Sequence, residues 1–180
     1  MAEGLITLDP GTSSAGLACF FDTKLQAVFR AKRPSEARSG PGEGKRWALT
    51  LGRDLVDQAQ KWLVKYPHID KWTVVSEYQQ IYQSGTARTS NAKDVLVCTL
   101  QTGYFLGGVR ETCCDYDVTC IAREPAKWKG QMKKDKMNQL TLHRLSPDEI
   151  DVLDTLKRAK RNPDVLDAVG IGLDHLRRLR

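Results

Sequence analysis

The stretch that decides the fold is LITLDPGTSSAGLACFFDTKLQAVFRA, residues 5–31. It holds three short apolar runs, at 5–9, 15–21 and 25–31, which are separated by turn residues. Runs of this length between turn residues predict strands at hairpin spacing. The first run ends on a carboxylate, Asp9. We therefore expect an antiparallel three-stranded meander with an acidic residue at the end of its first strand.

The rest of the chain alternates between helical and strand-like patterns. The expected elements are a helix at 46–66, a strand at 72–77, a helix from about 91, a strand at 116–122, and helices at 135–144, 146–160 and 164–176. The helices are predicted from apolar residues that recur every three to four positions. Ser146 and Glu149 form a capping-box pattern. The sequence predicts a single α/β domain over residues 1–180.

One segment, residues 32–45, fits neither pattern. It mixes charged and polar residues with prolines and glycines at Pro34, Gly40, Pro41, Gly42 and Gly44. Clusters of proline and glycine are typical of loops. We expect a mobile loop here, between the third strand and the first helix.

The chain is basic, with a net charge of +6 and a pI near 9.1. Lysines and arginines gather at 123–136 and at 177–180. Such clusters neutralise phosphates, so a nucleic acid is an expected partner. A solvated basic face explains any one cluster equally well.

Cysteine usage and hydropathy point to a reducing compartment. The five cysteines are odd in number and include no CxxC pair, which predicts reduced thiols and no zinc site. No apolar run approaches the roughly 20 residues that span a bilayer. Residues 1–4 lack the features of a secretion signal. We expect the protein to stay in the cytoplasm.

Four acidic residues stand out by position. Asp9 and Glu77 each end an apolar strand. Asp164 and Asp167 lie three residues apart on the last helix, so both project from one face. A carboxylate at the end of a buried strand is costly unless a partner or a metal compensates it. Taken singly, each has an ordinary explanation, namely a helix cap for Asp164 and solvation at the sheet edge for Asp9 and Glu77.

Together the four acids indicate a metal site. Three strands followed by helix, strand, helix and strand is the order of an RNase H-like sheet, a mixed five-stranded sheet flanked by helices. In that sheet the first and fourth strands are neighbours, so Asp9 and Glu77 would lie side by side with the last helix packed across them. Clustered carboxylates bind hard divalent cations. Two Mg²⁺ ions about 4 Å apart, with Mn²⁺ as a substitute, could activate water for phosphodiester cleavage.

Around these acids the chain resembles the RuvC family of Holliday-junction resolvases. LITLDPGTSSAG at 5–16 is similar to the family's opening strand and its DPG turn, and VVSE at 74–77 to its second acidic motif. NPDVLDA at 162–168 resembles the closing pattern of two acids three apart before an alanine. PAKWKGQ at 125–131 is similar to the segment in which the family carries DNA-contacting lysines. The similarity runs in order along the whole chain.

The resemblance implies a homodimeric endonuclease of DNA recombination and repair that cuts four-way junctions with magnesium. The implied metal ligands and catalytic residues are Asp9, Glu77, Asp164 and Asp167. The implied or candidate DNA contacts are Lys129, Lys134, Lys136, Tyr82 and Arg88.

Three features depart from the family pattern. The aromatic residue that the family places three positions after its second acid is Gln80 here. The loop at 32–45 is richer in charge and glycine than the family's, and Trp128 has no assigned role. Such divergence suits a phage or mobile-element relative, which would act at the bacterial nucleoid or in a phage-infected cell.

Three other interpretations stay open. DPGTSS at 9–14 also resembles the phosphate-binding turn of actin-like sugar kinases, but 180 residues cannot hold the two domains of that fold. A nuclease of the same fold that acts on a flap, other branched DNA or an RNA–DNA hybrid would use the same acids. A non-catalytic binder of branched DNA would have no need of four buried carboxylates, which are costly without a metal.

Overall fold

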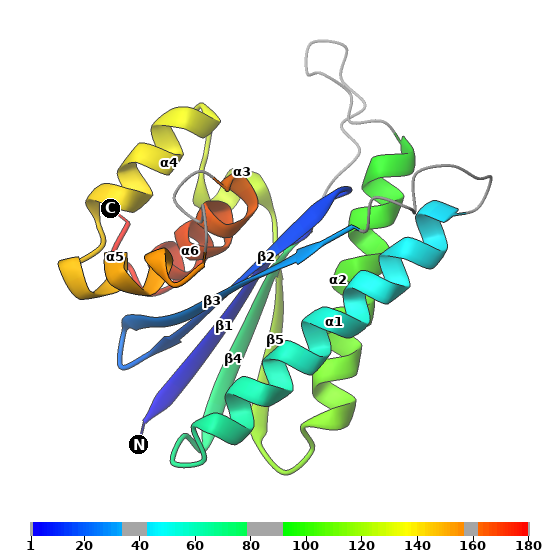
Figure 1. Cartoon of the computed structure of the whole chain (residues 1–180), viewed down its shortest axis with the longest axis horizontal. Helices are drawn as coiled ribbons and strands as arrows, with labels where there is room; N and C mark the ends of the chain where they lie inside the picture. Colours follow the sequence, from blue (N-terminus) through cyan, green and yellow to red (C-terminus); the bar gives the residue numbers. More distant parts are fainter. Residues whose placement is uncertain (1, 34–42, 79–91, 157–161, 180) are drawn as a thin grey trace.

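A five-stranded mixed sheet with helices on both faces forms the body of the protein (Figure 1). The computed structural model describes residues 2–33, 43–78, 92–156 and 162–179. Its elements are β1 (Glu3–Asp9), β2 (Ser14–Phe21), β3 (Lys24–Lys32), α1 (Glu43–Lys65), β4 (Lys71–Glu77), α2 (Ala92–Thr112), β5 (Asp117–Arg123), α3 (Pro125–Trp128), α4 (Lys134–His143), α5 (Pro147–Asp154) and α6 (Pro163–His175). The strand order is β3-β2-β1-β4-β5.

The pairing of the strands confirms the predicted RNase H-like sheet. β1, β2 and β3 form the antiparallel meander, and β4 and β5 add to it in parallel. β1 and β4 are direct neighbours, with Leu8 opposite Ser76. Asp9 pairs with Gly16 at the start of β2. The carboxyl ends of β1 and β4 therefore meet at one edge of the sheet.

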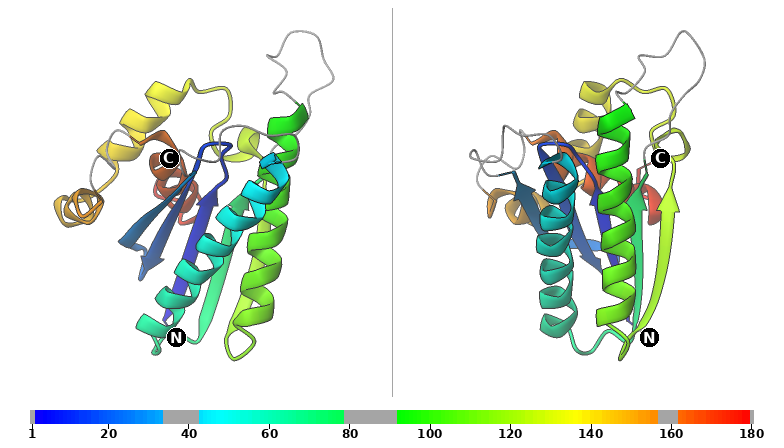
Figure 2. Two further views of the ribbon diagram at one scale, coloured as in Figure 1. Left: turned by 45° about the vertical axis from the view of Figure 1, so that its right-hand side comes forward. Right: turned by 90° about the vertical axis from the view of Figure 1, so that its right-hand side faces the viewer.

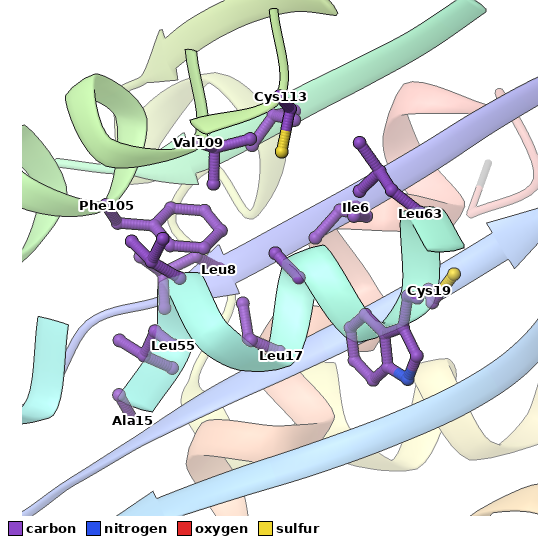
Figure 3. Close-up of a cluster of buried hydrophobic side chains, with 14 of the residues drawn as sticks. Ile6, Leu8, Ala15, Leu17, Cys19, Leu55, Leu63, Phe105, Val109 and Cys113 are labelled. Carbon is purple, nitrogen blue, oxygen red and sulfur yellow. The ribbon is translucent and has the colours of Figure 1, made fainter. Parts of the chain in front are cut away.

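Each face of the sheet is covered by its own helices and its own core. α1 and α2 lie on one face, and α4, α5 and α6 lie on the other (Figures 1 and 2). Ile6 and Leu8 of β1 pack with Leu55, Leu63 and Phe105 of the first helical layer (Figure 3). The opposite core joins Leu5 and Val75 to apolar residues of α6. Because alternate residues of a strand face opposite sides, the parity of each position decides which core it enters.

Two helix boundaries differ from those expected by more than two residues. α1 begins at Glu43, so the end of the predicted loop at 32–45 is helical, and Lys32 belongs to β3. A single helical glycine such as Gly44 costs only about 1 kcal/mol, too little to stop a helix. α5 ends at Asp154 and does not continue toward residue 160. There the Thr155 hydroxyl donates to the carbonyl of Val152, a local bond that competes with helix propagation. The mobility predicted for the loop falls mostly on residues outside the described part of the chain.

All five cysteines lie in the described part of the chain. Cys19, Cys98 and Cys113 are buried and all five cysteines are free. Among the described residues, no helix is long and apolar enough to cross a membrane.

A largely buried ion pair between Arg178 and Glu149 holds the C-terminal segment against α5. Arg178 donates to both carboxylate oxygens of Glu149, each at 2.7 Å. Glu149 also accepts from the backbone N–H of Leu25 and of Ser146, the latter bond completing the predicted capping box. Burial alone would raise the pKa of Glu149, but these hydrogen bonds lower it to about 2. The pair thus links β3, α5 and the chain end.

We expect Glu149→Gln to lower the free energy of unfolding by about 2 kcal/mol at pH 7, because it breaks a largely buried pair. The folded-state pKa lies below the ordinary value of 4.5, so this stabilisation is present above pH 4.5 and is lost as pH falls toward 2. Urea denaturation of both proteins between pH 7 and pH 2.5 measures the difference. The control is Glu3→Gln, whose exposed pair with Lys71 contributes little. A Glu149→Gln deficit that does not change with pH would contradict this account.

Candidate active site

The four acids predicted from the sequence line one cleft. Asp9, Glu77, Asp164 and Asp167 surround a cavity of about 250 Å³, together with Lys129 and Lys134. Asp9, Glu77 and Asp167 are buried, with 5%, 1% and 2% of their surface exposed. The fold therefore brings together carboxylates from β1, β4 and α6, which are far apart in the sequence.

Strand parity places Asp9 and Glu77 on the face that α6 covers. Ile6 and Leu8 enter the α1–α2 core, so Asp9 points to the other side. In β4, Val75 belongs to the α6-side core, and Glu77 lies two residues further on the same side. Since β1 and β4 are parallel neighbours, the two carboxylates end up adjacent.

One helix cap and two contacts with the sheet fix the position of α6. The side chain of Asn162 accepts from the backbone N–H groups of Asp164 and Val165 and so caps the helix. The helix cap is therefore Asn162 and not Asp164, and the Asp164 side chain lines the cleft. The Thr7 hydroxyl of β1 donates to the carbonyl of Ala168 at 2.6 Å, next to Asp167. Gly16 of β2 lies against the first turn of α6, where a Cβ atom would come within 2.7 Å of the Val165 Cα.

The turn that follows Asp9 is held from the opposite helical layer. Buried Gln101 of α2 donates from Nε2 to the carbonyl of Gly11 at 3.0 Å. Cys98, also on α2, donates from Sγ to the carbonyl of Pro10. Burial, followed by the charge of Asp9, raises the pKa of the Cys98 thiol to about 12. Cys98 is therefore protonated at neutral pH and leaves the ligand chemistry of the cleft to oxygen atoms.

Two lysines counter the charge of the acids. Lys129 Nζ lies 3.4 Å from Glu77 Oε2 and 3.9 Å from Asp167 Oδ2, and Lys134 Nζ lies 3.2 Å from Asp167 Oδ2. Burial alone would lower the pKa of Lys134, but Asp167 and Asp9 raise it. With all four carboxylates ionised, the two ammonium groups leave an excess of two negative charges in the cleft. One divalent cation would balance that excess.

The acids repel one another in their buried surroundings. Burial raises the pKa of Asp9 well above its ordinary value, and the charges of Glu77 and Asp167 raise it further. Burial also raises the pKa of Glu77, although Lys129 and a hydrogen bond from Trp128 oppose this. Both carboxylates are therefore destabilised as anions until a cation joins them.

The donor set fits a hard divalent cation. Asp167 Oδ1 is buried and has no hydrogen-bond partner, so it presents a lone pair that a cation would satisfy. Carboxylate oxygens are the ligands that Mg²⁺ prefers. In the described part of the chain, no three or more His, Cys, Asp or Glu side chains are yet gathered so that they could hold a metal ion. Lys129 and Lys134 lie between the acids instead.

Of the remaining predicted residues, one lies outside the cleft and two lie outside the described residues. Lys136 is exposed on α4 and is not part of the cleft lining. Tyr82 and Arg88 lie outside the described residues. Asp174, which follows Asp167 by two helical turns, forms an ion pair with Arg123 at 2.5 Å in a separate cleft that also contains His175.

Three residues that hold the side chains of the acids, directly or in turn, were not predicted from the sequence. The Ser14 hydroxyl donates to Asp164 Oδ2, and Arg30 donates to Ser14 in turn. The indole of Trp128 donates to Glu77 Oε2 at 2.7 Å. Ser14 lies within the quoted DPGTSS turn, but its spacing gives no signal of a partner 150 residues away. For Trp128, the sequence offered one clue: a side chain with an N–H donor directly before Lys129 in an otherwise polar segment.

Comparison with solved structures identifies the architecture. RuvC of Thermus thermophilus in complex with a Holliday junction substrate superposes with a TM-score of 0.62 at 17% identity, over 97% of this chain and 92% of that one. The chain has the RuvC-type fold. A second Thermus thermophilus RuvC structure gives 0.56 at 18% identity, covering 96% and 93% of the two chains. The yeast mitochondrial Holliday junction resolvase Ydc2 gives 0.52 at 13% identity, covering 97% and 78%. No family model matches the chain, and no curated protein is significantly similar to it in sequence.

In this RuvC-type fold, the contact between Gly16 and α6 should be sensitive to a single methyl group. We expect Gly16→Ala to lower the free energy of unfolding by about 3 kcal/mol, because the new Cβ overlaps the backbone of Asp164 and Val165. The control is Gly103→Ala on α2, where nothing lies within 4 Å and helix propensity favours alanine by up to about 1 kcal/mol. Urea denaturation of the three proteins compares them. Equal stability of Gly16→Ala and the unaltered protein would place α6 further from β2 than described.

Charge repulsion in the cleft should also be measurable as stability. Without divalent metal, Asp9→Asn should raise the free energy of unfolding by about 1–3 kcal/mol, because it removes one of several buried like charges. For a domain of this size, that corresponds to a melting temperature about 3 °C higher or more. Saturating Mg²⁺ should stabilise the unaltered protein and remove this advantage. Thermal melts with Mg²⁺ and with chelator test both points, and an Asp9→Asn protein that melts lower in chelator would contradict the repulsion.

Proposed function

We propose that this chain is a metal-dependent endodeoxyribonuclease that resolves four-way (Holliday) DNA junctions in recombination and repair. The observation that carries the proposal is the cleft at the ends of β1 and β4, where four carboxylates and two lysines meet under α6. Such a set can hold divalent cations and contact phosphate oxygens at the same place. The RuvC-type fold supports a junction substrate, since one RuvC with this fold is known in complex with a Holliday junction.

In phosphodiester hydrolysis, the acids of the cleft would bind metal ions and the lysines would bind phosphates. Asp9, Glu77, Asp164 and Asp167 would hold two Mg²⁺ ions, or Mn²⁺ in their place. The ions supply Lewis-acid stabilisation of the attacking and leaving oxygens. Lys129 and Lys134 are cations at the rim, with 24% and 51% of their side chains exposed, and would contact the phosphates of the bound strand.

Further contacts extend the surface that the DNA would follow. Lys136 lies two residues beyond Lys134 on α4, and we include it with Tyr82 and Arg88 among the proposed DNA contacts.

Symmetric cutting of a four-way junction needs two active sites, so we propose a homodimer. Leu96 and Tyr104 are exposed on α2 and support a pairing surface there. We place the protein in the cytoplasm, where the DNA is.

The proposal is tested by cleavage of a labelled four-way junction, beside linear duplex, a flap and an RNA–DNA hybrid. We expect paired nicks near the branch point that need Mg²⁺ or Mn²⁺. Asp9→Asn should lower the rate of cleavage at least about 10³-fold and leave junction binding intact, because asparagine keeps the size of the side chain and removes the ligand charge.

The control variant is Asp22→Asn, which changes an exposed aspartate in the β2–β3 turn, at the end of the sheet opposite Asp9. It should cut like the unaltered protein. Metal-dependent cutting of the flap or hybrid alone would move the function to another nuclease of the same fold. Tight junction binding without cutting in either metal would favour a non-catalytic binder.

A further inference from the structure

The short helix α3 places the indole of Trp128 against Glu77, one of the acids of the cleft. Trp128 is its last residue and is only 3% exposed. Its indole Nε1 donates to Glu77 Oε2 at 2.7 Å, a short bond between a rigid donor and a buried carboxylate. Glu77 itself is 1% exposed, so this bond forms where water has little access.

The position of the indole is fixed from its other side. Trp128 belongs to the apolar core on the α6 face. A Cβ atom on Gly170 of α6 would lie 2.8 Å from the Trp128 ring, so only glycine at this position lets the ring pack so closely. The ring therefore contacts the helix that carries Asp167 and, through Nε1, holds the acid that ends β4.

A second donor to the same oxygen lies further away and is less fixed. Lys129 Nζ lies 3.4 Å from Glu77 Oε2 and is shared with Asp167 at 3.9 Å. An ammonium group at the end of a four-carbon chain can turn to a phosphate or make room for a cation. The indole, packed against α6, cannot turn away in the same manner.

We propose that Trp128 is a positioning residue for the metal site: its indole N–H fixes the carboxylate of Glu77 in the orientation that receives a divalent cation. The inference rests on the proposed function, in which Glu77 is a metal ligand. Partners of this kind orient a ligand before the metal arrives, and their loss commonly lowers metal affinity about 10- to 100-fold. Packing in an apolar core would not by itself require an indole N–H at this position, whereas orienting Glu77 does.

Trp72 supplies a matched control for a purely structural tryptophan. It is fully buried in the opposite core, packs against Gly4 near the start of β1, and its Nε1 has no hydrogen-bond partner. Replacement by phenylalanine removes the same atoms at both positions. Only at position 128 does the change remove a donor to Glu77.

The experiment measures Mn²⁺ binding to the full chain by calorimetry, without DNA. We expect Trp128→Phe to weaken Mn²⁺ binding about tenfold or more, Trp72→Phe to bind within about twofold of the unaltered protein, and Glu77→Gln to lose binding. Unchanged affinity in Trp128→Phe, with binding lost in Glu77→Gln, would overturn the role of Trp128 alone. Equal binding by Glu77→Gln and the unaltered protein would overturn the ligand assignment, and with it the inference.

A second measurement needs no variant at position 128 to fold. The four tryptophan indole N–H signals of the ¹⁵N-labelled protein can be assigned by replacing Trp47, Trp62 and Trp72 in turn. Titration with Mg²⁺ should shift the Trp128 signal most strongly, because its acceptor becomes a metal ligand. A Trp128 signal that stays in place while Mg²⁺ saturates the protein would overturn the proposal.

Discussion

Repulsion among the buried carboxylates of one cleft is the constraint on which the rest of the structure depends. Asp9, Glu77 and Asp167 are each at most 5% exposed, so water does little to screen them. The pKa of Asp9 is raised by burial first and by its acidic neighbours next. Such an arrangement persists only if the surrounding elements fix it, and only function gives a reason to keep it. Lys129 and Lys134 reduce the repulsion without removing it.

The scaffold meets that constraint by placing a separate apolar core on each face of the sheet. The α1–α2 core fixes β1 and β4 side by side, which sets the distance between the ends that carry Asp9 and Glu77. The opposite core seats α6 directly on β1 and β2, and Gly16 lets its first turn approach closely. The positions of the four acids are thus determined by apolar packing at a distance from their carboxylate groups. Movement of α6 relative to the sheet would separate Asp164 and Asp167 from Asp9 and Glu77.

The fold and the four acids were predictable because they follow from short-range patterns. The turn residues after Asp9, the short apolar runs of β1 and β4, and the i, i+3 spacing of Asp164 and Asp167 are all visible locally. The contact of Trp128 with Glu77 joins residues 51 positions apart and depends on where α3 places one ring. The pair of Glu149 with Arg178 likewise forms only after α5 and the chain end have packed. No sequence spacing encodes such contacts, because they depend on tertiary geometry.

The charges of the cleft connect metal binding to DNA binding. With all four carboxylates ionised and both lysines in place, the excess of two negative charges matches a single divalent cation. A second ion would make the cleft positive unless an anion entered or a lysine left. On the proposed function, a DNA phosphate is such an anion, and Lys129 and Lys134 at the rim of the cleft would contact it. On the proposed function, the second metal ion and the substrate therefore favour each other's binding, and the cleft is assembled fully only on DNA.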